Sequence, residues 1–154
     1  MVVAIAADHG GYQLKKVLAV YLGERGHTVH DLGTHDEHAV DYPDFARAIA
    51  LDLREHRAER GILVCGSGVG ASVAANKFPG IRAGLCHDTF SAHQGVEDDD
   101  MNVLCLGARV IGPELAKEIA RTFLAAAFSG ADRHVRRVGK VVQIERECRN
   151  AQGV

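Results

Sequence analysis

The residues best suited to chemistry in this chain lie in one glycine-rich stretch, Cys65-Gly66-Ser67-Gly68-Val69-Gly70. The stretch follows an apolar run, residues 61–64, and precedes a pattern that can open a helix. Glycines let the backbone turn sharply and approach a ligand, and a helix start adds unpaired N–H groups and a positive dipole end. The stretch therefore predicts a cradle for an anion, with a thiol and a hydroxyl at its mouth, and acid–base chemistry on a small charged molecule.

The same stretch has a purely structural interpretation, because glycine-rich turns between a strand and a helix often serve only packing. From these residues alone the two interpretations are about equally supported. The stretch is not a Walker A loop, since no Lys-Ser or Lys-Thr pair closes it. It is also a poor dinucleotide fingerprint, because its third glycine comes one position too early.

Each polar group of this stretch has a plausible chemical role. A thiolate beside backbone N–H groups can act as a base or a nucleophile. For Cys65 a base is the better interpretation, because no Cys-His-Asn protease signature is present. Ser67 could donate a hydrogen bond to a substrate oxygen, and the amides of residues 66–70 could hold a developing oxyanion such as an enediolate.

Two other groups of residues are candidates for ligand binding. Asp8 and His9 follow the first apolar run; they could bind sugar hydroxyls and a ring oxygen, or simply cap and pack against the next helix. Arg133 and Arg137 are four residues apart and so share a helix face. Forked guanidinium groups suit a phosphate, and Arg109 could join them. A run of charge is usually a solvated face, but this local basic cluster in an acidic chain favours a small phosphorylated ligand.

The composition excludes several other classes of protein. The chain has 154 residues, a length that suits one domain, and a net charge of −2, which gives no general attraction to nucleic acid or membranes. We find no signal peptide and no apolar run long enough to span a bilayer. The four cysteines form no Cys-x-x-Cys pair, which favours reduced thiols and a cytoplasmic location. Two His-x-x-His pairs in residues 27–38 favour surface histidines over a metal site, and we expect no metal.

The elements that must position these residues alternate along the chain. Five short apolar runs predict strands, at residues 2–7, 28–32, 61–64, 81–86 and 103–106. Helical spacing predicts a helix that includes Leu14 to Leu22 and stops at Gly26, and a second that Pro43 opens and that carries Phe45, Ile49 and Leu53. Further helices are predicted over residues 71–77, 89–96, 113–128 and 133–147, with a solvated turn at Asp98-Asp99-Asp100. This alternation predicts an α/β fold with a five-stranded parallel sheet covered on both faces, of flavodoxin-like (Rossmann-type) order, with a C-terminal helix.

In such a sheet, ligands bind beyond the carboxyl ends of the strands. Polar clusters follow four of the five predicted strands. They are Asp8-His9, the stretch Cys65 to Gly70, His87-Asp88 and Gly107 to Arg109. Four clusters converging on one edge indicate a ligand site more strongly than any one of them alone.

Taken together, these motifs resemble those of the ribose-5-phosphate isomerase type B and galactose-6-phosphate isomerase family. The matching segments occur in family order over nearly the whole chain. They are Ala7-Asp8-His9-Gly10-Gly11, Asp41-Tyr42-Pro43, Cys65 to Gly70, Ala75-Asn76-Lys77, Gly80-Ile81-Arg82-Ala83, Asn102-Val103, Gly107 to Gly112, Arg133-His134 and Arg137.

The resemblance implies a homodimer or dimer of dimers with active sites at the subunit interface, which interconverts aldose and ketose phosphates without a metal or nucleotide cofactor. It implies that Cys65 is the base and Ser67 a supporting hydroxyl; a family subgroup uses a Glu base where this chain has Ala74 and Ala75. The substrate-binding positions implied are Asp8, His9, Tyr42, Gly66, Gly68, Val69, Gly70, Asp99 and Asn102. The phosphate-binding positions implied are Arg109, Arg133, His134 and Arg137.

One residue departs from the family pattern. The family commonly has a histidine, assigned to sugar ring opening, where this chain has Asp98. A carboxylate is a poor acid near neutral pH unless burial raises its pKa. Three alternatives stay open: Asp98 is a tuned acid, another residue such as His9 or His87 opens the ring, or the substrate needs little ring opening, as a tetrose 4-phosphate would.

Two functions of other classes compete with an isomerase. A non-catalytic sugar-phosphate-binding module would keep the fold and lose the acid; the Asp98 departure is its only support, and the intact Cys65 stretch opposes it. A flavin-binding relative is weakly supported, because the chain has no Trp and few aromatic residues to enclose a ring.

Overall fold

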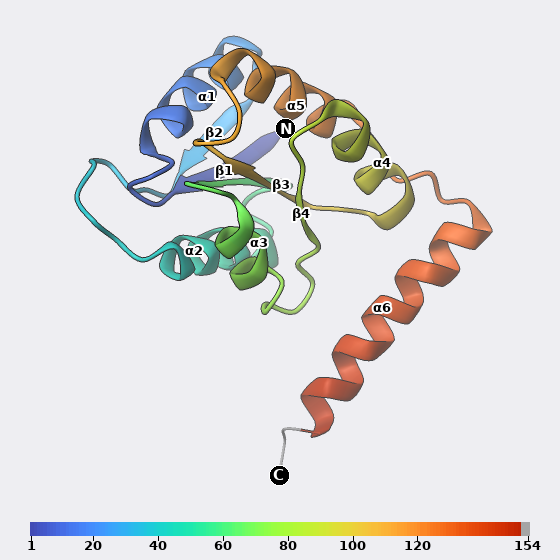
Figure 1. Cartoon of the computed structure of the whole chain (residues 1–154). Coiled ribbons are helices and arrows are strands. Elements are labelled where there is room, and N and C mark those ends of the chain that lie inside the picture. Colours follow the sequence, from blue (N-terminus) through green and yellow to red (C-terminus); the bar gives the residue numbers. More distant parts are fainter. Residues whose placement is uncertain (152–154) are drawn as a thin grey trace.

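The structure, a computed structural model, describes residues 1–151 and contains a central sheet with helices on both sides (Figure 1). The strands are β1 (Val2–Ala7), β2 (Thr28–Asp31), β3 (Arg60–Cys65), β4 (Ala83–Leu85) and β5 (Val103–Gly107). The helices are α1 (Tyr12–Glu24), α2 (Tyr42–Arg54), α3 (Val69–Ala75), α4 (Thr89–Asp99), α5 (Pro113–Ala125) and α6 (Asp132–Ala151). The predicted alternation of strands and helices is confirmed.

The sheet is entirely parallel, with the order β2-β1-β3-β5-β4. The predicted three-layer α/β architecture is confirmed. In detail, the last two strands are exchanged relative to the 2-1-3-4-5 order of flavodoxin itself. As a result β5, and not β4, lies beside β3, with Cys65 in register with Gly107. This pairing sets the neighbours of the Cys65 stretch.

Alternate residues of the central strands face two separate apolar layers. Val3, Ile5, Val64 and Leu106 belong to the layer under α1, α4 and α5. The other set of sheet residues, which includes Leu63, Cys65 and Cys105, packs under α2 and α3. Burial on both faces explains why the strands appear in the sequence as continuous apolar runs.

Some predicted boundaries were wrong. The predicted turn at residues 98–100 is mostly helix, since α4 runs on to Asp99 and only Asp100 has the left-handed conformation, with φ 51°. No Gly or Pro interrupts that acidic run, so the helix that buries Val96 continues through it. β4 has three residues, where six were predicted, and α5 ends at Ala125, where residue 128 was predicted.

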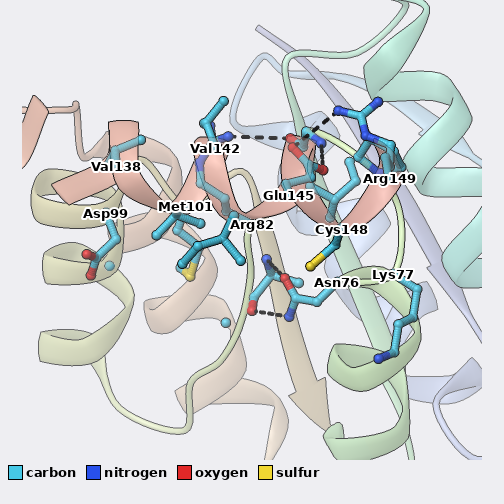
Figure 2. Close-up of a pocket in the computed structure, with 18 of the residues that line it drawn as sticks. Asn76, Lys77, Arg82, Asp99, Met101, Val138, Val142, Glu145, Cys148 and Arg149 are labelled. Carbon is cyan, nitrogen blue, oxygen red and sulfur yellow. Dashed lines mark hydrogen bonds and ion pairs between the residues drawn. The ribbon is translucent and has the colours of Figure 1, made fainter. Parts of the chain in front are cut away.

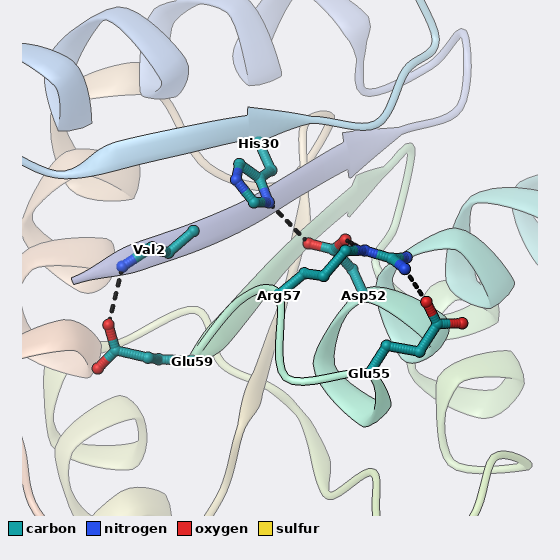
Figure 3. A network of polar contacts seen from close by, with 6 residues as sticks. All are labelled: Val2, His30, Asp52, Glu55, Arg57 and Glu59. Atoms are coloured by element: carbon teal, nitrogen blue, oxygen red, sulfur yellow. Dashed lines mark hydrogen bonds and ion pairs between the residues drawn. The ribbon is translucent and has the colours of Figure 1, made fainter.

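A polar network fixes the end of α2 and the loop that leads into β3 (Figure 3). Asp52 is only 2% exposed. Its carboxylate accepts a hydrogen bond from Arg57 Nε at 2.7 Å and lies 3.0 Å from His30 Nδ1 on β2. Burial alone would raise the pKa of Asp52, but the hydrogen bonds from Arg57 and His30 outweigh it and hold that pKa below its usual value. His30, predicted as a surface histidine, therefore takes part in a structural contact.

The last helix, α6, projects from the rest of the molecule (Figure 1). It leaves Val135, Val141 and Ile144 exposed. Within residues 1–151, no helix combines the length and the apolar character needed to cross a membrane.

Candidate active site

Cys65 ends β3 with its sulfur facing the turn that follows. Gly68 N–H donates to Cys65 Sγ at 3.0 Å, and the thiol is only 4% exposed. Gly68 has φ 79°, a conformation that favours glycine. A Cβ at this position would lie 2.9 Å from the carbonyl carbon of Leu106, so the loop also needs glycine for its close approach to β5. The result is a sulfur with an amide donor aimed at it, which suits an atom that carries negative charge.

The rest of the stretch forms the mouth of the cradle. Ser67 Oγ accepts a hydrogen bond from Val69 N–H at 3.2 Å, at the first residue of α3. Gly70 lies against the ring of Tyr42, since a Cβ on Gly70 would be 2.8 Å from Tyr42 Cζ. Tyr42 therefore borders the stretch, at the position that the sequence resemblance implies for a substrate-binding residue.

The end of β1 lies directly beside this stretch. Asp8 is buried, and its N–H donates to the Val64 carbonyl at 3.2 Å. Its Oδ1 accepts from Gly11 N–H at 3.0 Å and so closes the turn before α1, which leaves the other carboxylate oxygen available. The N-cap of α1 is Gly11, without a side-chain cap bond, so Asp8 does not cap the helix as considered from the sequence. A Cβ on Gly10 would be 3.3 Å from Gly66 N, which shows how closely the two loops meet. His9 is exposed, and its Nδ1 lies 3.2 Å from Val40 N.

Arg109 reaches the same loop from the end of β5. Its N–H donates to the Gly66 carbonyl at 2.9 Å. The guanidinium group lies over Gly66, because a Cβ on that glycine would be 3.6 Å from Arg109 Cζ. A cation is therefore present at the mouth of the cradle, where the phosphate of a small substrate could be held.

A second group of predicted residues lies away from Cys65 in the same chain. Asp98 is in the last turn of α4, which begins after the carboxyl end of β4 and runs back across the sheet. At 1.5 Å per residue, nine residues separate Thr89 from Asp98 by about 14 Å along the helix. Asp98, Asp99 and Asn102 consequently lie toward the amino-terminal edge, and Asn102 uses its side-chain amide to hold Arg82 N and Gly80 O, at 2.8 Å each.

The predicted phosphate-binding residues of α6 join this second group. His134 is 3% exposed; its Nε2 lies 3.3 Å from Asp98 Oδ1 and 3.0 Å from Arg133 Nε. Its Nδ1 lies 2.6 Å from Ser129 Oγ. Arg137, one turn further along α6, is exposed. One chain thus carries a thiol half-site, at the carboxyl edge, and a basic half-site around Asp98 and the start of α6.

An open groove of about 830 Å³ separates α6 from residues 76–84, which run from the end of α3 into β4 (Figure 2). Its walls are largely apolar where Val138 and Val142 face Met101. Glu145 accepts a hydrogen bond from Gly80 N–H at 2.7 Å across it. Asn76 belongs to a family motif for which the sequence implied no role. Its side-chain amide donates to the Ala83 carbonyl and accepts from Ala83 N–H, each at 2.9 Å, and so holds this segment in place.

The other two buried cysteines, Cys86 and Cys105, are poorly suited to base chemistry. Burial, with a smaller effect of Asp88, raises the pKa of Cys86 to about 11. Burial also raises the pKa of Cys105 far above its usual value. Both remain protonated near neutral pH, as expected for small apolar side chains, so Cys65 is the buried cysteine placed for chemistry. Among residues 1–151, no three His, Cys, Asp or Glu side chains gather as a metal site.

This chain is similar to known proteins over nearly its whole length. The family described as Ribose/Galactose Isomerase matches residues 3–141. Ribose-5-phosphate isomerase B of Escherichia coli is 44% identical over 143 residues, 93% of this chain and 95% of that protein. D-erythrulose-4-phosphate isomerase of Pectobacterium atrosepticum is 45% identical over 130 residues, 83% of this chain and 85% of that protein. The structure of Clostridium thermocellum ribose-5-phosphate isomerase B has a TM-score of 0.93 at 47% identity and covers 96% of this chain and 99% of its own.

The fold, the thiol loop at its carboxyl edge and these similarities together define an enzyme of the aldose–ketose isomerase class. The chain belongs to the Ribose/Galactose Isomerase family of sugar-phosphate isomerases. The family resemblance drawn from the sequence motifs is confirmed.

Proposed function

We propose that the enzyme interconverts ribose 5-phosphate and ribulose 5-phosphate, with Cys65 as the base. The observation that carries this proposal is the sulfur of Cys65 at the end of β3, 3.0 Å from the Gly68 amide and inside a cradle of backbone donors. The similarity to ribose-5-phosphate isomerase B of Escherichia coli supports the choice of substrate.

The chemistry needs only proton transfer. In the aldose-to-ketose direction the Cys65 thiolate removes the proton from C2, and the electron pair forms a C1–C2 double bond while O1 becomes negative. The amides of the 66–70 loop and the Ser67 hydroxyl stabilise this enediolate. The proton then returns from the thiol to C1, and the O2 proton moves to O1, which restores the C1 hydroxyl as the C2 carbonyl forms. Asp8 and His9 bind the sugar, and Arg109 is one of the cations that hold the phosphate.

The active unit in this proposal is a homodimer in which each site combines the thiol half-site of one chain with the basic half-site of the other. The separation of Asp98, Arg133, His134 and Arg137 from Cys65 within one chain supports it, as does the apolar face that α6 presents. Each copy would then supply what the other lacks, as a two-fold interface requires.

Mixing two impaired variants tests this sharing, with the substrate kept well below the wild-type KM so that Arg137→Ala alone has little activity. Cys65→Ala and Arg137→Ala chains are unfolded together, refolded at equal amounts and assayed. Half of the dimers are then mixed, and each mixed dimer has one intact site of two, so about a quarter of wild-type activity should return. Sites built within one chain would give no activity above that of the separate variants.

A tetrulose 4-phosphate is the second candidate substrate. Asp98 favours it, because a tetrose 4-phosphate stays open-chain and needs no acid for ring opening. The 45% identical relative from Pectobacterium atrosepticum, a D-erythrulose-4-phosphate isomerase, agrees with this reading. In the structure Asp98 accepts a hydrogen bond from Gln94 Nε2 at 2.9 Å, and its Oδ1 lies 3.3 Å from His134 Nε2.

Turnover of the purified enzyme on four-, five- and six-carbon aldose phosphates, with a metal chelator present, tests the function. We expect the highest kcat/KM for ribose 5-phosphate. A value that is tenfold higher for erythrose 4-phosphate would establish the second candidate, and no turnover on any of them would contradict the proposed function.

A further inference from the structure

His87 stands in for a backbone carbonyl at the point where β4 ends. Along the β4–β5 pair, Val103 N–H donates to the Arg82 carbonyl at 3.2 Å and Cys86 N–H to the Cys105 carbonyl at 3.3 Å. In a parallel ladder every second residue of a strand hydrogen-bonds to its neighbour, so the next expected bond would run from Gly107 N–H to the Cys86 carbonyl. Instead, Gly107 N–H donates to His87 Nε2 at 3.0 Å.

This contact fixes the tautomer of the neutral His87 side chain. Nε2 accepts a hydrogen bond, so it has no proton of its own, and the ring proton of the neutral histidine is on Nδ1. A side chain without an acceptor at the Nε2 position would leave the Gly107 amide unpaired beneath the cradle.

Gly107 in turn supports the loop that holds Cys65. A Cβ on Gly107 would lie 2.5 Å from the Ser67 carbonyl oxygen, so the two backbones are in direct contact. The next two amides bind the same loop: Ala108 N–H donates to the Cys65 carbonyl and Arg109 N–H to the Gly66 carbonyl, each at 2.9 Å. A shift of Gly107 is therefore transmitted to Ser67 and to the Gly68 amide aimed at the sulfur.

We infer that His87 is a positioning residue for the reaction: by holding the Gly107 amide, it sets the Ser67–Gly68 backbone against Cys65. This inference rests on the proposed role of Cys65 as the base. Geometric errors of about 1 Å near reacting groups can cost roughly a hundredfold in rate. Loss of the His87–Gly107 contact should therefore lower kcat by roughly 10- to 100-fold.

Two substitutions distinguish this role from simple packing. His87→Gln places an amide oxygen where Nε2 lies, whereas His87→Asn places its oxygen near the position of Nδ1 and leaves the Gly107 amide without an acceptor. We expect His87→Gln to keep kcat within about threefold of wild type, and His87→Asn and His87→Ala to lose roughly 10- to 100-fold in kcat, with smaller changes in KM. If the three variants have equal kcat once folded, the inference is wrong.

Amide hydrogen exchange tests the same contact without any substrate. In the wild type and His87→Gln, the Gly107 and Gly68 amides should be protected; in His87→Asn, both should exchange at least tenfold faster, while amides within β1 keep their wild-type rates. Unchanged exchange at Gly68 in His87→Asn would overturn the inference. Because this readout needs no turnover, it decides the role of His87 even if every sugar phosphate proves inert and the proposed function fails.

Discussion

Gly68→Ala tests the idea that the Cys65 loop is held by close packing and by a left-handed residue. Gly68 and Gly80 both have φ 79°, but a Cβ at Gly80 would meet no atom within 4 Å. A Cβ at Gly68 would lie 2.4 Å from Leu85 Cδ1 and 2.9 Å from the Leu106 carbonyl carbon. Gly80→Ala is thus a matched control that carries the backbone strain alone.

The left-handed conformation should cost either alanine variant about 1–2 kcal/mol. Overpacking against the β5 backbone adds about 1–3 kcal/mol at Gly68, so the free energy of unfolding should fall by about 2–5 kcal/mol in Gly68→Ala. For a chain of this size each 1 kcal/mol lowers Tm by roughly 2–4 °C. The Gly68 amide also donates to Cys65 Sγ, so kcat should fall by at least tenfold in Gly68→Ala and stay near wild type in Gly80→Ala.

The assays are urea unfolding at one fixed protein concentration, because an oligomer's stability depends on it, and steady-state turnover. Equal losses of stability in the two variants, with unchanged kcat in both, would refute the packing argument.

Three further predictions address the phosphate site, the polar network and the substrate. Arg137→Ala should raise KM by roughly 10- to 100-fold, because it removes a charge-assisted contact, while its neighbour Arg136→Ala should leave KM nearly unchanged; equal effects in steady-state kinetics would remove Arg137 from the site. Asp52→Asn should lower the free energy of unfolding by about 1–3 kcal/mol at pH 7. Because the native pKa of Asp52 lies below its usual value, the stability that its carboxylate contributes is present above about pH 4 and disappears as the pH falls through the native pKa. The difference in unfolding free energy between wild type and Asp52→Asn, measured in urea, should therefore be smaller at pH 3 than at pH 7. A constant difference would contradict this prediction. Asp98→His should raise kcat/KM for ribose 5-phosphate more than for erythrose 4-phosphate, since only the pentose needs ring opening; parallel changes would rule out Asp98 as a determinant of substrate choice.

The thiol half-site could be predicted from the sequence because its signals are local. An apolar run that ends at Cys65 and a glycine pattern right after it specify a strand end and a turn. Asp8 and Arg109 follow neighbouring strands in the same way. The parallel sheet then places all three at one edge.

The remaining features depend on contacts that spacing does not encode. The acidic run at Asp98 resembles a turn in the sequence, and it is helical because α4 packs along α5 and continues to Asp99. The exchange of β4 and β5 has no signal in the sequence, and it is what brings Gly107 beside Cys65. The pairing of His87 with Gly107 depends on the register of β4 against β5, so the sequence indicates a polar residue after β4 without indicating its partner.

The most direct test of Cys65 as the base is proton exchange in D₂O. The wild-type enzyme, mixed with ribose 5-phosphate, should place solvent deuterium on the exchanging carbon of the sugar phosphate, as followed by NMR. Cys65→Ala should bind a phosphate ligand with nearly wild-type affinity and exchange at least a thousandfold more slowly. Near wild-type exchange by Cys65→Ala would contradict the proposed mechanism.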